Sequence, residues 1–150
     1  MGTANSSPFA NNSKVKYFEE LRFFTSITSL TRWNTTTFQK VKFPPHLRTI
    51  DYYVGTWGAS PILDFPNSLT TIQLSFWLRL SSNPNRILIL RSETPPSVTD
   101  AYFDAAKIGT LYIPSAYRAA YEAHSVWGRL SAKMANLEGS AYEVFNEWEF

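Results

Sequence analysis

The sequence predicts a mainly β or α/β solenoid, that is, a short and irregular stack of strand repeats with a C-terminal capping helix. Three observations lead to this prediction. First, the 150 residues are 44% hydrophobic and only 17% charged, a composition that excludes a disordered chain. Second, strand-like phrases recur at a nearly constant interval in the middle of the chain. Third, an alanine-rich segment with apolar residues at helical spacing follows the last phrase.

Residues 1–13 are expected to form a flexible N-terminal arm, because they are small and polar apart from Phe9. They lack the basic and apolar regions of a secretory signal, so no signal peptide is expected. Phe9 is the one large apolar side chain through which this arm would dock on a partner.

Four copies of a short phrase alternate apolar and other residues, which predicts strands with one buried face. The copies are evenly placed along the chain, at Val41–Pro44, Leu63–Pro66, Ile87–Leu90 and Leu111–Pro114. Proline closes three of them and cannot donate to a ladder, so it ends the strand and turns the chain. The third copy has Leu90 where proline is expected.

A second phrase keeps step with the first and places apolar residues three apart. It occurs at Ile27–Leu30, Leu47–Ile50 and Leu69–Ile72. A unit of this length cannot bury its own apolar side, whereas stacked copies share one core. The segments around Tyr52–Ser60 and Gln73–Arg86 depart from the repeat and predict irregular coils.

This pattern resembles the BspA-like leucine-rich repeat proteins, which are common in Bacteroidales and their phages. The likeness covers Tyr17 to Leu130: Phe18–Leu30 looks like a first coil, and Thr110–Ser115 looks like a last strand leading into a capping helix. The cysteine-containing element of the family is absent. The resemblance implies a leucine-rich repeat solenoid over residues 14–130 and a role in adhesion or protein–protein interaction.

Residues 115–130 are expected to form the capping helix. Pro114 suits a first helical turn, and many alanines follow it. Apolar and aromatic residues recur there at three- and four-residue steps and predict one buried stripe: Tyr117, Ala120, Tyr121, His124, Trp127 and Leu130. Such a helix would close the open end of the stack, where exposed strand edges invite aggregation.

Residues 131–150 predict an acidic, aromatic C-terminal tail. Lys133 is the last basic residue of the chain, and four of the acidic residues follow it, so a net positive body precedes a net negative tail. Aromatic side chains alternate with the carboxylates, and we expect them to dock either on the basic body of the chain or on a partner. The expected docking residues are Tyr142, Phe145, Trp148 and Phe150.

The sequence predicts no enzyme, no cofactor and no metal site. The two histidines, His46 and His124, lie far apart in the chain, and without cysteine no zinc-ligand spacing is present. No G-x-S-x-G motif occurs, and the six glycines are isolated rather than gathered in a phosphate loop. Asp100 and Asp104 are suitably spaced for an acid/base pair, but Asp100 more simply starts a short helix around residues 101–107.

The candidate binding patch consists of aromatic residues in the irregular coils: Tyr52, Tyr53, Trp57, Phe76 and Trp77. Flat rings beside glycine and asparagine give contact area at little entropic cost, which is typical of glycan- and protein-binding surfaces. The alternative is that several of these rings fill the core in place of leucine. The neighbouring threonines Thr70 and Thr71 indicate β propensity rather than a ligand-binding array.

We therefore expect a non-catalytic interaction module. The two aromatic ends and the missing signal favour a phage virion component, either structural or for host attachment. The alternative, favoured by the resemblance, is a bacterial cell-surface adhesin or glycan-binding module outside the cell. The expected partners are virion or cell-surface proteins and glycans, with homo-oligomers left open. Scattered basic residues argue against nucleic acid, and the lack of any long apolar run argues against a membrane span.

Overall fold

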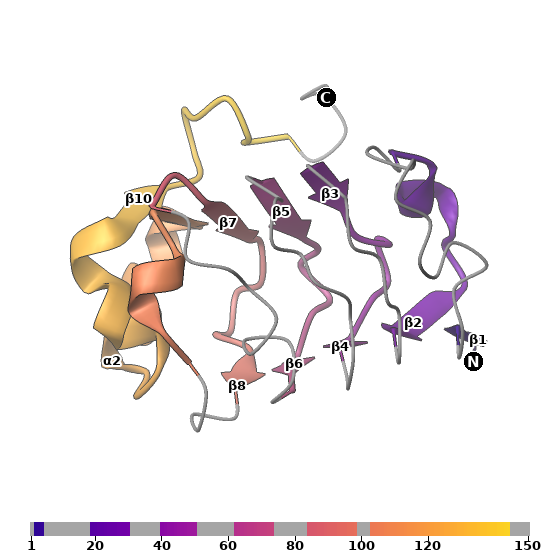
Figure 1. Ribbon diagram of the computed structural model, residues 1–150, viewed down its shortest axis with the longest axis horizontal. Coiled ribbons are helices and arrows are strands. Elements are labelled where there is room, and N and C mark those ends of the chain that lie inside the picture. The colour runs from indigo at the N-terminus through magenta and orange to yellow at the C-terminus, as the bar shows by residue number, and fades with distance from the viewer. Residues whose placement is uncertain are drawn as a thin grey trace.

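The computed structural model describes residues 2–4, 19–30, 40–50, 62–73, 84–98 and 103–144. These residues form two five-stranded parallel sheets and a few short helices, so the fold is mixed α/β. Figure 1 shows the two sheets as two rows of strands, with α2 at one end and β1 and β2 at the other. Sheet A has the order β1 (Gly2–Ala4), β2 (Ile27–Leu30), β4 (Thr49–Ile50), β6 (Thr71–Ile72) and β8 (Ser97–Val98). Sheet B has the order β10 (Met134–Asn136), β9 (Thr110–Ile113), β7 (Ile87–Leu90), β5 (Ile62–Phe65) and β3 (Lys40–Lys42).

From β2 to β9 the successive strands alternate between the two sheets, so that each sheet receives every second strand. The first phrase of the repeat forms β3, β5, β7 and β9 of sheet B, and the second phrase forms β2, β4 and β6 of sheet A. In sheet A, Leu30 pairs with Ile50, and Ile50 pairs with Ile72. These three side chains are fully buried, which confirms that the second phrase turns its last apolar residue inward.

The third copy of the first phrase lies one residue further along the chain than the pattern indicates. Leu88, rather than Ile87, pairs with Leu63. Arg91 therefore takes the position that proline occupies in the copies on β5 and β9. The prediction was wrong here because β7 is buried on both faces, so no alternation of apolar and polar residues marks its inner side.

The core lies between the two sheets and continues under the C-terminal helices. The side chains of Phe43 and Phe65 stack with ring centroids 4.6 Å apart and planes 10° from parallel. Gly109, just before β9, lies so close to the preceding coil that a Cβ there would be 1.9 Å from the carbonyl oxygen of Pro84. The tight approach therefore requires glycine at this position.

The predicted single helix over residues 115–130 is in fact three short ones: η4 (Ser115–Tyr117), α2 (Arg118–Ala123) and η5 (Trp127–Lys133). The chain becomes extended at His124, whose Nδ1 accepts hydrogen bonds from the backbone N–H groups of Val126 and Trp127. This side chain therefore satisfies two backbone N–H groups at the start of η5, just after the end of α2. Of the predicted stripe, Tyr121, Trp127 and Leu130 are buried, whereas Ala120 is exposed.

Both predicted ends include residues that belong to the sheets. Gly2–Ala4 in the expected arm form β1, which pairs with β2, while Phe9 lies outside the described residues. Residues 131–137 complete η5, form β10 beside β9, and bury Leu137. The tail therefore begins after Leu137, and Figure 1 shows its described part, up to Val144, on the outer side of sheet B.

Two short 3-10 helices complete the described fold. The segment η1 (Glu19–Phe23) precedes β2, and η3 (Ala105–Lys107) precedes β9. The helix η3 is capped by Asp104, whose Oδ1 accepts a hydrogen bond from the backbone N–H of Ala106. The sequence assigned the start of this helix to Asp100, which lies outside the described residues.

Candidate functional site

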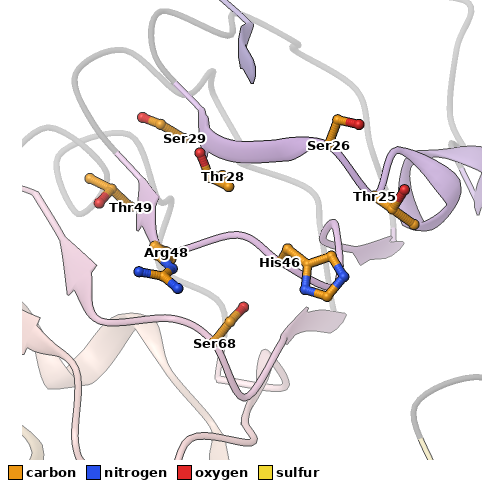
Figure 2. Close-up of a pocket in the computed structure, with 8 residues that line it drawn as sticks. All are labelled: Thr25, Ser26, Thr28, Ser29, His46, Arg48, Thr49 and Ser68. Carbon is orange, nitrogen blue, oxygen red and sulfur yellow. The ribbon is translucent and has the colours of Figure 1, made fainter. Parts of the chain in front are cut away.

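An open groove of about 670 Å³ lies where three successive passes of the chain lead into sheet A (Figure 2). The first pass precedes and forms β2, the second leads into β4, and the third turns towards β6. The lining residues are Thr25, Ser26, Thr28, Ser29, His46, Arg48, Thr49 and Ser68.

The parallel ladder holds these passes in register. The backbone N–H of Arg48 donates to the carbonyl of Thr28 at 2.8 Å, and that of Thr70 donates to the carbonyl of Arg48 at 2.9 Å. The Ser68 hydroxyl ties the turn of its own pass to the one before it, because it donates to the carbonyls of Pro45 and Leu47 at 2.9 and 2.8 Å. The floor of the groove is therefore a set of fixed backbone passes rather than one loop.

The lining residues that the structure describes contribute one guanidinium, one imidazole, six hydroxyls and no carboxylate. Arg48 and His46 are both exposed. Within the described part of the chain, the Arg48 and His46 side chains have no hydrogen bond or ion pair. The same holds there for the hydroxyls of Thr25, Ser26, Thr28, Ser29 and Thr49. The groove thus offers hydrogen-bonding groups that the described part of the chain does not use itself.

A second, smaller groove of about 320 Å³ follows at the next corner of the chain. Its lining includes Asn67, Thr70 and Glu93. The carboxylate of Glu93 gives this groove the opposite charge from the first one. The two neighbouring grooves are therefore chemically different surfaces.

The outer side of sheet B carries a buried ion pair, and its arginine also lines a groove of about 350 Å³ with Pro66 and Leu137. The Arg91 guanidinium forms a two-pronged contact with Asp64, with Nε–Oδ1 and Nη2–Oδ2 distances of 2.8 Å. The same guanidinium donates to the backbone carbonyls of Tyr142 and Glu143 at 2.5 and 2.7 Å. Arg91 thereby connects the C-terminal tail to β5.

Tyr142, one of the expected docking residues, lies against the chain's own body. Its ring meets that of Tyr112 edge to face, with centroids 5.2 Å apart. Partial burial, with a smaller contribution from Tyr112, raises the pKa of the Tyr142 phenol. Of the two docking possibilities for the tail, this residue follows the internal one.

The other predicted site residues lie outside the described residues. These are the patch residues Tyr52, Tyr53, Trp57, Phe76 and Trp77 and the docking residues Phe9, Phe145, Trp148 and Phe150. Of the two histidines, His46 lines the groove, whereas His124 lies in the C-terminal cap. Partial burial lowers the pKa of the His124 imidazole, which favours the neutral form that accepts the two backbone hydrogen bonds.

Sequence reasoning missed the hydroxyl groups along sheet A. Alignment of the second phrases would have revealed them, because Ser29 pairs with Thr49, Thr49 with Thr71, and Thr71 with Ser97. From the sequence alone, Thr70 and Thr71 indicate only a preference for β structure. The fourth member of the row was hidden because Ser97–Val98 follows two prolines instead of a leucine phrase.

The groups that line the groove differ in how far the described part of the chain already uses them. The Ser68 hydroxyl is committed to two backbone carbonyls, and His46 makes no hydrogen bond to a hydroxyl among the described residues. No group of three or more His, Asp or Glu side chains among the described residues is placed to hold a metal ion. No helix in the described ranges has the length and apolar character to cross a membrane.

No protein-family model matches this sequence, and no curated protein matches it either. The proposed function therefore rests on the two sheets, the groove and the contacts of Arg91.

Proposed function

We propose that the chain is a short leucine-rich-repeat-like solenoid of the BspA type. Its support is the regular alternation of strands between two parallel sheets, with each strand pairing with the equivalent strand one repeat away. The step along the chain from Val41 to its partner Leu63 equals the step from Thr49 to its partner Thr71. The step from Ser29 to Thr49 is shorter and that from Thr71 to Ser97 is longer, so the coils vary in length. The short helices α2 and η5 would act as its C-terminal cap.

The function supported best is that of a non-catalytic attachment module whose groove on sheet A holds the ligand. The observation that carries this proposal is the set of unused donors and acceptors held on a rigid parallel ladder. A site built on fixed strands loses little entropy when a ligand binds, so modest polar contacts give useful affinity.

The first location proposed is a phage virion, with the chain as a structural or host-attachment component held by its ends. The support is the aromatic character of residues 145–150 and of Phe9 in the sequence. Density-gradient fractionation of the native source, followed by mass spectrometry for this chain, tests the proposal. Co-sedimentation with particles is expected, whereas recovery only in a soluble or cell-surface fraction would contradict the virion role.

The anchoring residues are best tested by substitution rather than truncation. Removal of residues 134–150 would delete β10 and the buried Leu137, so loss of particle association could reflect loss of the fold. The triple variant Phe145→Ala, Trp148→Ala, Phe150→Ala should abolish particle association with the two-sheet fold retained. A variant that still co-sediments as the native protein does would exclude these side chains as anchors.

The second candidate is a bacterial cell-surface adhesin or glycan-binding module, and the polar groove favours it. Arg48→Gln should then remove binding of the purified protein to cells, and Thr49→Val should weaken that binding severalfold. The triple variant at the end of the chain should leave that binding intact. The reverse outcome would favour attachment through the ends.

A further inference from the structure

We infer that the groove on sheet A binds an acidic oligosaccharide, whose anionic group lies on Arg48 and whose hydroxyls lie on the Ser and Thr side chains. This inference rests on the proposed attachment function and names its ligand. Among the described lining residues, Arg48 contributes the one permanent positive charge, and none of these residues carries a carboxylate that would neutralise it.

The guanidinium of Arg48 is suited to anionic oxygens. Its planar donors match a carboxylate or a sulfate in a two-pronged arrangement, which a single ammonium group does not. The structure shows how such a contact differs from a structural one. Arg91 uses its donors on Asp64 and on the tail, whereas the Arg48 side chain makes no contact of this kind within the described chain.

The hydroxyls select for a polyhydroxylated ligand rather than a bare anion. Ser29 and Thr49 stand on adjacent parallel strands, about 4.8 Å apart across the ladder. Each hydroxyl both donates and accepts, as sugar hydroxyls do, so a sugar chain laid across the strands meets a matching group at each step. Further along the row the hydroxyls are used internally, since Ser97 Oγ lies 3.3 Å from Thr71 Oγ1.

The neighbouring groove limits where the anion lies. Glu93 places a negative charge at the next corner, where an anionic group would be repelled. The acidic group of the ligand therefore sits at the Arg48 side, and the chain of sugars extends away from Glu93, across Thr28 and Thr25.

The experiment measures binding of the full chain to three oligosaccharides by isothermal titration calorimetry. An oligogalacturonate supplies carboxylates, a chondroitin sulfate oligosaccharide supplies carboxylates and sulfates, and the methyl-esterified oligogalacturonate supplies the same sugar without charge. We expect binding to at least one of the two acidic probes and at least about tenfold weaker binding to the ester. Binding to the acidic probe should weaken as salt rises from low to high concentration.

Arg48→Gln should weaken binding of the acidic probe by about tenfold or more. The affinity of Arg48→Lys should lie between those of the native chain and Arg48→Gln, because lysine keeps the positive charge but cannot make the two-pronged contact. Thr49→Val should weaken it by about two- to fivefold. Two matched variants should bind as the native chain does. Arg129→Gln removes an exposed positive charge on η5, and Thr110→Val makes the same side-chain change on sheet B.

Three results would overturn the inference: equal affinity for acid and ester, no effect of Arg48→Gln, or no binding to any of the three probes. Equal affinity for acid and ester, or no binding to any probe, leaves the proposed attachment role standing, because that role is measured by particle or cell association. Native cell binding of Arg48→Gln, together with native probe binding, would remove the groove from the proposed attachment role as well. A chain that attaches to particles or cells but binds no acidic sugar would keep the first proposal and lose this one.

Discussion

The two sheets are built from strands of one repeat, yet their outward positions have opposite character. On sheet B the outward row includes Lys42, Asp64 and Ile89, all of which are fully buried. On sheet A the equivalent row of Ser29, Thr49 and Thr71 is half-exposed. The tail, held by Arg91, lies on the outer side of sheet B, whereas the hydroxyl row faces an open groove.

The difference shows that coverage, rather than the strand itself, decides which polar groups an outward position tolerates. A buried charge needs a partner with good geometry, and Asp64 has one in Arg91. A half-exposed position needs no such partner, because water can satisfy its hydroxyl. One repeat thus gives a covered face on sheet B and an open face on sheet A.

The largest effect is expected from Asp64→Asn on sheet B. Removal of the Asp64 charge takes away the carboxylate of the two-pronged contact with the Arg91 guanidinium, which is 10% exposed, and loosens the hold of Arg91 on the tail. We expect the free energy of unfolding, measured in urea, to fall by about 3–5 kcal/mol. The matched control is Glu122→Gln, which removes the exposed pair of Arg118 and Glu122 and should cost about 0.5 kcal/mol or less. Similar losses in the two variants would contradict the contrast between buried and exposed ion pairs.

Truncation of an inward-facing side chain should lower the free energy of unfolding by a similar amount on either sheet. Leu63 on sheet B and Ile72 on sheet A are both fully buried in the same core. Leu63→Ala and Ile72→Ala should each lower the free energy of unfolding by about 2–5 kcal/mol through lost burial and a new cavity. A loss below about 1 kcal/mol at Ile72 would mean that sheet A packs less firmly than sheet B.

Alkaline pH should weaken the contact between Tyr121 on α2 and Ser92, which lies between β7 and β8. The Tyr121 hydroxyl lies 2.9 Å from both the carbonyl and Oγ of Ser92. Burial raises its pKa from 10.0 to about 12, and the hydrogen bond with Ser92 offsets this only in part. The raised pKa means that the folded state holds the phenol proton more tightly than the unfolded state does. The contribution of this group to the free energy of unfolding is therefore fully present below pH 10 and is lost as the pH rises towards 12.

Chemical unfolding between pH 9 and 12 tests this dependence. The native chain should lose about 2–3 kcal/mol across the window through this group. Tyr121→Phe should be less stable by about 1 kcal/mol at pH 7 and should show a shallower decline above pH 10. Parallel declines in the two proteins would assign the alkaline loss to other groups.

Much of the fold could be predicted from the repeat, because its phrases report the alternation of buried and open positions. The strands at Leu63 and Leu111 lie where that alternation predicts them. The register of β7 could not be predicted, since both faces of that strand are buried. The break at His124 was also hidden, because it depends on a side-chain cap rather than on helical spacing.

The candidate site was harder to predict than the fold. Sequence reasoning looked for aromatic rings, which stand out singly, and interpreted the threonines as strand formers. The groove arises only when residues from three passes come together, and no one pass carries a motif. The contacts of Arg91 were hidden for the same reason, because they join β5 to carbonyls of the tail, which lies far along the sequence.

The smallest expected effect on stability is that of Thr49→Val on sheet A, and it separates binding from folding. Thr49 is half-exposed, and its hydroxyl makes no hydrogen bond within the described residues, so valine of nearly the same shape leaves no buried group unsatisfied. The free energy of unfolding should therefore stay within about 0.5 kcal/mol of the native value. The same variant should weaken cell binding or sugar binding severalfold. A large loss of stability would mean that the outward row of sheet A holds the fold together as that of sheet B does, and an unchanged affinity would remove Thr49 from the ligand contact.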